Sequence, residues 1–477
     1  PMRRLLLIVV LIQAALVTGF LVALGSGRFP LGVPGEWEWT RLQVAPTLLD
    51  WMTALLGITL YAGVIGQGSR VLSRKASRGR EGVLVSILIV ASVAVQATVQ
   101  SGAPQGYGLT KWVTLAMPGS SGYDTVAKRE ARDPWRFWAA YPDWIKTQDA
   151  LHIGTHPPGL FLTAKASRTL MESQPELARF VVAHLPETVL VGFREILGPL
   201  STTDKATLAW IGAWTLLACS ATVAPLYCLA RGSGLSSSAA WASAALWPLV
   251  PSTILFQPTA DTAFPLLSTT ALALAVPGKP WAAVLAGVTL ALGMQFTLAF
   301  LPVGLIAALM LLSLPGTPWR RRLLLVWATG LGFLGFTLVV WTVSGADPFL
   351  IWWWNQKNHA QFYLEFPRTY RAWVIANPVE LAVALGLPIV VWAGSGLKQA
   401  PRAAWATLAV LAVLNFSGRN LSEVARLWLP LMPPLLTLAG AGLCRLGGGG
   451  RTLAATAGLL GLQTVALQAL IQVVYPV

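Results

Sequence analysis

The sequence has few charged residues and almost no cysteine. Asp, Glu, Lys and Arg together make up 11% of its 477 residues, and only three residues are cysteine. So little charge places the chain well outside the composition of soluble globular proteins. Cys219, Cys228 and Cys444 lie within or beside apolar runs. They therefore indicate neither a disulfide framework nor a cysteine metal site, and we interpret them as small buried hydrophobes.

Several motifs are also absent. The sequence contains no P-loop, and its glycine-rich stretches do not follow strand patterns, so nucleotide binding of those kinds is unsupported. No apolar segment carries the row of charges typical of a voltage sensor or a proton relay. Ionisable residues instead gather at the ends of the apolar segments, which points to chemistry at a membrane interface.

The sequence does contain many long hydrophobic runs. Hydrophobic residues make up 55% of the chain, and many runs approach the roughly 20 residues that cross a bilayer as a helix. The runs are continuous and not alternating, which favours helices over a barrel. We predict an all-α polytopic membrane protein with about thirteen transmembrane helices, and we expect the first apolar run to be a retained span. The predicted spans are 5–24, 47–66, 83–100, 206–230, 238–256, 260–276, 281–296, 299–314, 323–343, 379–396, 403–416, 427–443 and 452–474.

The net charge of +15 reports orientation. With these spans, the loops on one side carry 16 basic residues and a single acid, Glu81, and the other side carries 18 of each sign. The whole excess is the positive-inside pattern, which predicts a cytoplasmic N-terminus in the inner membrane. It therefore gives no reason to expect a nucleic-acid partner.

The predicted spans divide the chain into three regions. Residues 1–100 hold three spans and a first external loop at 25–46, and residues 101–205 form a large external loop. Residues 206–477 hold the remaining spans, with external loops near 344–378 and 417–426. The spacing within 134–148 and 175–198 predicts amphipathic helices lying in the interface. A soluble domain with its own core is the weaker alternative.

The first external loop carries the candidate catalytic residues. Glu36 and Glu38 alternate with tryptophans just beyond the first span. In an extended chain they would point the same way, and one partly desolvated carboxylate can take a proton from an acceptor hydroxyl. The alternative is an interfacial loop that its tryptophans anchor and whose acids are solvated.

A second motif is His-Ile-Gly-Thr-His-Pro-Pro-Gly at 152–159. We predict a turn followed by a helix that begins at Pro157, because proline fits the first turn of a helix. Backbone N–H groups near Gly159 would then suit a phosphate, and His156 could add a hydrogen bond or a proton. The alternatives are an ordinary capped helix start or, with His152 and His156 as ligands, a zinc site.

Some basic residues lie near aromatic, membrane-proximal segments, where an anionic lipid headgroup would need them. Arginine can hold a phosphate with two hydrogen bonds, although any one of these residues could equally be solvated or ion-paired. We include His359 and Glu423 from the same loops among the candidate substrate-binding residues. Asp50, Asp261 and Glu380 have a simpler explanation, since acids near the start of a helix complement its dipole. The candidate basic residues are Lys111, Arg132, Arg136, Lys357, Arg419 and Arg426.

These features resemble the C-type glycosyltransferases, polytopic enzymes that use polyprenyl-phosphate-linked sugars. The group includes protein mannosyltransferases and the bacterial aminoarabinose transferases that act on lipid A. The resemblance rests on the acidic first loop, the His-Pro-Pro-Gly segment, the number of spans and the late segment from Gly418 through Glu423 to Arg426-Leu427-Trp428. It implies that Glu36 or Glu38 is the base, and that Lys357, Arg419 and Arg426 hold the donor phosphate.

The function that the resemblance implies is transfer of a sugar, with inversion, to an acceptor on the external face. The acceptor class (lipid, protein or polysaccharide) stays open. A divalent metal ion could assist the departing phosphate, and no other cofactor is implied. The alternatives are a transporter or flippase for a lipid-linked anion, which would need polar residues at mid-membrane and related halves, and a non-catalytic subunit.

Overall fold

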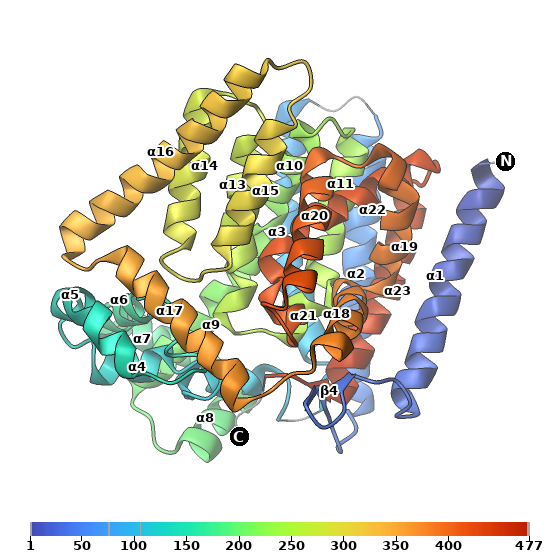
Figure 1. The fold of residues 1–477 in the computed structure, drawn as a ribbon. Helices are drawn as coiled ribbons and strands as arrows, with labels where there is room; N and C mark the ends of the chain where they lie inside the picture. The colour runs from blue at the N-terminus through green and yellow to red at the C-terminus, as the bar shows by residue number, and fades with distance from the viewer. Residues whose placement is uncertain (1, 75–76, 105, 475–477) are drawn as a thin grey trace.

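The computed structural model describes residues 2–74, 77–104 and 106–474, and within these ranges the fold is all-α (Figure 1). Long helices lie side by side, and short helices gather at one end of the bundle. The loop after α1 (Met2–Gly25) reaches this same end, whereas α1 begins at the opposite end. We call residues 101–201 the helical cap, and we call this end of the molecule the cap end.

Six helices among the described residues are long and apolar enough to cross a membrane. A seventh span results if α18 (Tyr370–Leu385) and the following helix, which meet at an angle of 100°, count as one. The predicted count of about thirteen is therefore not confirmed. The six are α1, α2 (Leu48–Leu72), α3 (Arg78–Gln100), the continuous pair α9 (Thr202–Ala221) and α10 (Val223–Gly232), α16 (Trp319–Ser344) and α23 (Gly450–Leu470).

The remaining predicted spans are helical but short, and proline or glycine interrupts several of them. Proline lacks the N–H that continues a helix, and Pro248 and Pro251 divide the predicted span 238–256 into three pieces. At Gly386 a φ of 103° separates α18 from its successor. The short elements are α11 (Ser237–Leu246), η3 (Trp247–Leu249), α12 (Pro251–Leu255), η4 (Ala260–Thr262), α13 (Phe264–Ala275), α14 (Pro280–Gly293), α15 (Phe300–Leu312), α19 (Leu387–Gly396), η5 (Leu397–Gln399), α20 (Arg402–Ser417), α21 (Val424–Leu427), η6 (Leu429–Leu431) and α22 (Pro433–Arg445).

Large apolar side chains are exposed along the outer helices. Leu7 on α1, Leu56 on α2 and Trp327 on α16 are exposed by 59%, 60% and 71%. Water would make such a surface unfavourable, whereas lipid chains accommodate it. The helix lengths and this surface together identify an integral membrane protein.

The helical cap is a packed unit with apolar clusters of its own. Phe137, Tyr141 and Phe161 form one cluster, which Ile351 completes from outside the cap. Both segments predicted as interfacial helices contribute to apolar clusters, the first with Phe137 and Tyr141 and the second with Val189 and Phe193, and the second cluster also includes Leu208 of α9. The cap elements are η1 (Leu109–Ala116), α4 (Tyr123–Arg129), α5 (Pro134–Trp144), η2 (Ile145–Thr147), α6 (Gly159–Ser173), α7 (Pro175–Ala183) and α8 (Glu187–Leu197).

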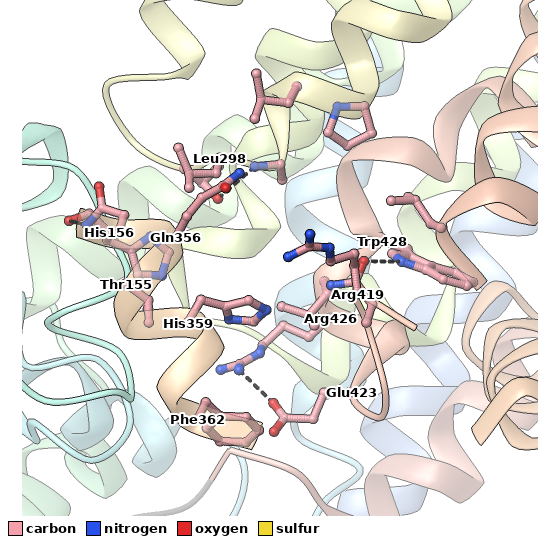
Figure 2. Close-up of a pocket in the computed structure, with 18 of the residues that line it drawn as sticks. Thr155, His156, Leu298, Gln356, His359, Phe362, Arg419, Glu423, Arg426 and Trp428 are labelled. Atoms are coloured by element: carbon pink, nitrogen blue, oxygen red, sulfur yellow. Dashed lines mark hydrogen bonds and ion pairs between the residues drawn. The ribbon is translucent and has the colours of Figure 1, made fainter. Parts of the chain in front are cut away.

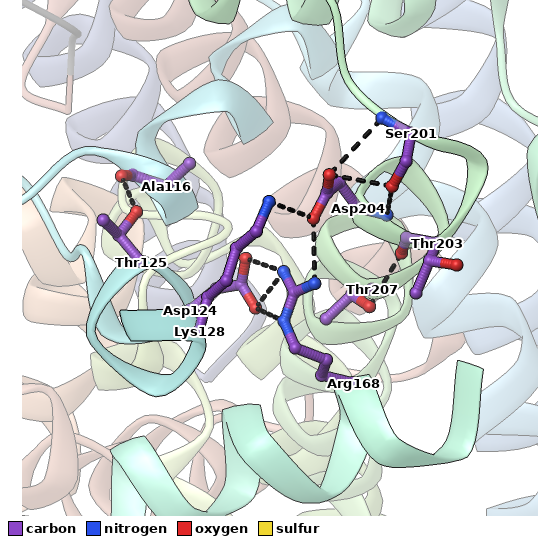
Figure 3. A network of polar contacts seen from close by, with 9 residues as sticks. All are labelled: Ala116, Asp124, Thr125, Lys128, Arg168, Ser201, Thr203, Asp204 and Thr207. Carbon is purple, nitrogen blue, oxygen red and sulfur yellow. Dashed lines mark hydrogen bonds and ion pairs between the residues drawn. The ribbon is translucent and has the colours of Figure 1, made fainter. Parts of the chain in front are cut away.

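A buried ion-pair network fixes the cap to the bundle (Figure 3). Arg168 of α6 holds the Asp124 carboxylate of α4 at 2.7 Å and Asp204 of α9 at 2.8 Å. Lys128 reaches the same Asp204 oxygen at 2.9 Å. Because breaking a buried pair leaves an uncompensated charge, this network resists separation of the three helices.

Most of the predicted external loop 344–378 is helical. Asp347 accepts hydrogen bonds from the N–H groups of Phe349 and Leu350 and so caps α17 (Pro348–Glu365). An aspartate followed by proline is a strong helix start. Helix α17 lies along the cap (Figure 1) and presents side chains to the site described next.

Candidate functional site

A cavity of about 740 Å³ lies at the cap end, and we call it the Arg426 cavity (Figure 2). It brings together segments that are far apart in the sequence: the loop at 150–156, the start of α15, one face of α17, the end of α20 and residues 418–431. Six of the predicted substrate-binding residues line it: His152, His156, His359, Arg419, Glu423 and Arg426.

Two asparagines of α17 hold the histidine loop in place. Asn355 and Asn358, three residues apart and so on one helix face, both donate to the carbonyl of Gly154, at 3.1 and 2.9 Å. Asn355 also donates to the His156 carbonyl at 3.0 Å, and the Tyr141 hydroxyl donates there at 2.7 Å. A side chain at position 154 would overlap the carbonyl of Asp149, which explains the glycine.

The ring of His156 is fixed in one tautomer. Its Nδ1 lies 3.0 Å from the carbonyl oxygen of Phe296, and because that oxygen can only accept, Nδ1 carries the proton. Nε2 is then left with a lone pair. Burial lowers the pKa of His156, and the nearby Asp261 opposes part of that shift. The ring is therefore neutral at neutral pH and can accept a proton.

Arg426 is the central cation of the cavity. Its guanidinium pairs with the Glu423 carboxylate at 2.6 Å and approaches Nδ1 of His152 at 3.5 Å. Its Nε is buried and has no hydrogen-bond partner within the described chain. Burial, together with Arg426 and His156, lowers the pKa of His152 well below its usual value. The guanidinium thus keeps donor capacity for an anion while the histidine beside it stays neutral.

The backbone that carries this ion pair is strained. Ser422 and Glu423 have φ values of 81° and 55°, in the left-handed region that residues other than glycine rarely occupy. Arg368 donates to the Ser422 hydroxyl at 3.3 Å. Arg419 lies on the same loop and lines the cavity (Figure 2). Such strain collects at functional sites, where the surrounding structure fixes the geometry.

The predicted catalytic pair does not line the cavity. Glu36 accepts from the Thr369 N–H at 2.9 Å and from the Trp373 indole at 2.7 Å. These bonds cap the start of α18, and the hydrogen bonds with Thr369 lower the pKa of Glu36. Glu38 lies exposed in a hairpin of β1 (Gly32–Val33) and β2 (Trp37–Glu38). The assignment of either glutamate as the base therefore finds no support in its placement.

The first loop is instead tied into the bundle. After the hairpin, β3 (Thr40–Arg41) pairs antiparallel with β4 (Ile471–Gln472), directly after α23. Arg41 also donates to the carbonyls of Leu24 and Phe29, at 2.8 and 2.9 Å. These contacts give the loop a structural role in joining α1, α18 and α23.

Four of the predicted phosphate-binding cations lie elsewhere. Lys111 is fully buried and donates to the carbonyl of Ile254 at the end of α12, and burial lowers its pKa to about 7. Lys357 stacks over the Trp354 ring at 4.4 Å. Arg132 and Arg136 are exposed on the cap. None of the four lines the Arg426 cavity.

The start of α6 is not free for a phosphate as predicted. The helix begins at Gly159, and the N–H of Gly159 donates to the carbonyl of Gln295 at 2.8 Å. Metal chemistry has no obvious site either. Within the described residues, no group of three His, Cys, Asp or Glu side chains is arranged to hold an ion.

The structure adds site residues that the sequence did not single out. Asp261 lines the cavity near His156, in addition to its place at a helix start. Asn355 and Asn358 are the other addition. Their spacing of three, in a helix rich in tryptophan, was the available signal.

Comparison with known proteins adds no relative. No protein-family model matches the chain, and searches of curated proteins and of solved structures find no match. The class is therefore defined by fold and geometry alone: an all-α membrane protein with a charged cavity at one end.

Proposed function

We propose that the protein is a membrane glycosyltransferase that takes a sugar from a polyprenyl-phosphate-linked donor. The observation that carries the proposal is the Arg426 cavity, which combines two arginines with a neutral histidine. Arg419 and Arg426 suit the donor phosphate, since arginine grips phosphate oxygens with paired hydrogen bonds. Neutral histidines beside them suit proton transfer.

An apolar flank of the cavity suits the donor's lipid chain. Leu298, Leu301, Phe362 and Leu414 contribute to the lining, and Leu301 is 48% exposed on the outer surface of α15. A polyprenyl chain could therefore leave the cavity sideways into the bilayer while its phosphate stays beside the arginines. A fully water-soluble donor would gain nothing from this flank.

We assign the role of general base to His156 in place of Glu36 or Glu38. Nε2 takes the proton of an acceptor hydroxyl, and the resulting oxygen attacks the anomeric carbon with inversion. The bond from that carbon to the phosphate oxygen breaks, and the phosphate leaves with the bonding electrons. Arg419 and Arg426 stabilise the charge that develops on it, an effect that is strong in a site shielded from water. The carboxylate of Asp261 stabilises the imidazolium that forms.

The proposal includes an orientation. In this orientation the cap end faces outward from the inner membrane and the N-terminus is cytoplasmic. The shorter apolar helices cross the membrane as well as the long ones, which gives about thirteen crossings in all. The basic loops at the opposite end support this orientation. Short spans are tolerated where protein packs around part of them, and α14, α15 and α20 are short apolar helices with one face buried in the bundle.

The test is a transfer assay in proteoliposomes with polyprenyl-phosphate-linked sugars that carry a radioactive label. We expect label to move to a hydroxyl-bearing acceptor, and we expect Arg426→Gln to lower the transfer rate by about a hundredfold or more. Arg136→Gln removes an arginine from the exposed cap and is the matched control. Movement of intact donor between leaflets without transfer would instead establish a flippase, and neither activity with any donor would refute the proposal.

A further inference from the structure

Two arginines meet at the last turn of α15, near the connection to α16 at the end of the molecule opposite the cap (Figure 1). Nη1 of Arg322, in the first turn of α16, donates to the carbonyl of Leu312 at 2.8 Å. Nη1 of Arg402, the first residue of α20, donates to the carbonyl of Met310 at 3.4 Å. Arginines placed in this way complement the negative end of α15. We call Arg322 and Arg402 the arginine pair.

These bonds leave part of each guanidinium group free. Arg322 also donates through Nε to the carbonyl of Thr317 at 2.9 Å, which leaves its Nη2 without a partner among the described residues. The same holds for Nε and Nη2 of Arg402. Neither arginine belongs to any ion pair within the described residues, and their two charges are close enough to repel each other. An anion between them would find free donors and would relieve this repulsion.

The sequence around the arginine pair supplies no carboxylate. The stretches 262–346 and 381–422, which contain all of α15, α16 and α20, include no Asp or Glu. No side chain caps the start of α16 or of α20, and a cation at the positive end of a helix is locally unfavourable. By contrast, Arg231 at the end of α10 lies 3.5 Å from the Glu81 carboxylate. The anion that suits the arginine pair must therefore come from outside the chain.

We propose that the arginine pair binds the head of an anionic phospholipid, a diacyl lipid whose phosphodiester has no balancing ammonium. Arginine holds phosphate oxygens through paired N–H groups, and a phosphate between two guanidinium groups offsets their mutual repulsion. Basic groups between membrane helices are suited to anionic headgroups for this reason. A zwitterionic head carries the same phosphate, but its ammonium would meet the same positive charge.

The surface of α16 beside the pair indicates a lipid and not a free phosphate. Trp319, Leu323, Trp327 and Leu331 recur every four residues and are all exposed, so they follow one side of the helix. Arg322 comes three residues after Trp319 and lies near the same side. Helix α16 is also a candidate membrane span. Acyl chains can therefore lie along this apolar side while the phosphate stays beside the arginines.

Helix α20 repeats the arrangement on a smaller scale. Trp405 is exposed and follows Arg402 by three residues, so each arginine has an exposed tryptophan about one turn away on its own helix. Tryptophan is enriched at the level of the lipid headgroups, which is the level that the phosphate would occupy. The arginine pair lies far from the cap end, and the inference does not depend on the proposed transferase activity.

The test is photolabelling of the full chain in phosphatidylcholine nanodiscs with a diazirine-bearing phosphatidylglycerol, followed by mass spectrometry. A phosphatidylcholine probe with the same chains is the control for the head. We expect the phosphatidylglycerol probe to label residues 319–331 and 402–405 about fivefold more than the control probe does, and an excess of inorganic phosphate to leave this labelling unchanged. Equal labelling by the two probes would overturn the proposal, and so would displacement by inorganic phosphate.

Two double variants test whether the pair itself is responsible. Arg322→Gln with Arg402→Gln removes both charges, whereas Arg78→Gln with Arg80→Gln removes two exposed charges at the start of α3. We expect labelling by phosphatidylglycerol to fall about fivefold or more in the first and to stay unchanged in the second. An equal fall in both, or no fall in the first, would overturn the proposal. The comparison of the two probes uses the unmodified protein, so it decides the matter even if the first variant does not fold.

Discussion

Two acidic segments of this protein differ in what surrounds them. The first, around Glu36, follows α1 and ends in a hairpin, where its carboxylate caps α18 through backbone and indole N–H groups. The second, around Glu423, lies on strained backbone, where its carboxylate pairs with a buried arginine beside two histidines. Both follow apolar segments and both contain tryptophan nearby. A carboxylate at a membrane boundary is therefore a candidate for catalysis only when other segments bring polar groups to the same cavity.

The largest effect should come from the second segment. Arg426→Gln removes the charge that we propose stabilises the leaving phosphate, and we expect transfer to fall by about a hundredfold to a thousandfold. The measurement is initial rate in proteoliposomes, normalised to folded protein by size-exclusion chromatography. Arg136→Gln should match the unmodified protein. An equal loss of transfer in both variants would show that Arg426 in the cavity matters no more for transfer than an arginine on the cap surface.

The His156→Gln variant tests whether His156 is the general base. Loss of a general base typically costs about a hundredfold to ten-thousandfold, and we expect a decrease in this range. In the proposed mechanism the neutral imidazole of His156 is the active form. Because burial lowers the pKa of His156, the rate should hold from neutral pH to below 6.5 and fall only at more acidic pH.

The residual transfer rate of His156→Gln should not show this fall at acidic pH, because the variant has no imidazole to protonate. A profile identical to that of the unmodified protein would assign the titration to another group. A Glu36→Gln variant with an equally large loss of transfer and intact folding would return the role of base to the first loop.

Glu36→Gln should act on stability more than on chemistry. The variant weakens charge-assisted hydrogen bonds to the start of α18, and we expect the free energy of unfolding to fall by about 1 kcal/mol, since the site is partly exposed and screened. Thermal unfolding in detergent measures this, and transfer per folded molecule should change less than about threefold.

The same carboxylate also predicts a direction for pH dependence. The pKa of Glu36 is lowered in the folded protein, so its contribution is complete above the unfolded value and is lost as the pH falls through the folded one. The stability difference between the unmodified protein and Glu36→Gln should therefore shrink in acid. A difference that grows in acid would contradict the capping role.

Glu38→Gln is the mildest change in the comparison. Its side chain is exposed on β2, and surface substitutions of this kind stay within about 0.5 kcal/mol. We expect unchanged unfolding temperature and unchanged transfer in the same two assays. A large loss of transfer here would show that the hairpin contacts substrate.

Local sequence was a good guide to the helices and a poorer guide to their boundaries. Hydrophobic runs identified the long helices, because each run must satisfy its own backbone hydrogen bonds. No helix was predicted within the external loop 344–378, although Asp347 followed by Pro348 is a helix-start signal in this polar, aromatic stretch. The apolar core of the cap was not predicted either, because Phe137 and Phe161 form it only when α5 and α6 meet.

The site was predictable in part. The histidine loop and the segment from Arg419 to Arg426 were singled out because of their residue types, and both line one cavity. Asp261 was not, since an acid at a helix start has an ordinary local explanation, and Asn355 was not, since its partners Gly154 and His156 lie far away in the sequence. Lys111 seemed a ligand for phosphate but caps α12 from inside the protein, a contact that joins residues far apart in the sequence.

The sequence by itself determined that this chain is a helical membrane protein with charge concentrated at the ends of its apolar segments, because hydrophobicity and length are properties of each segment alone. Only the tertiary structure decided which charges meet. The carboxylate of Glu36 accepts hydrogen bonds at a helix start, and that of Glu423 pairs with an arginine. Long-range packing decides this, because it fixes which donor lies within about 3 Å of each acceptor.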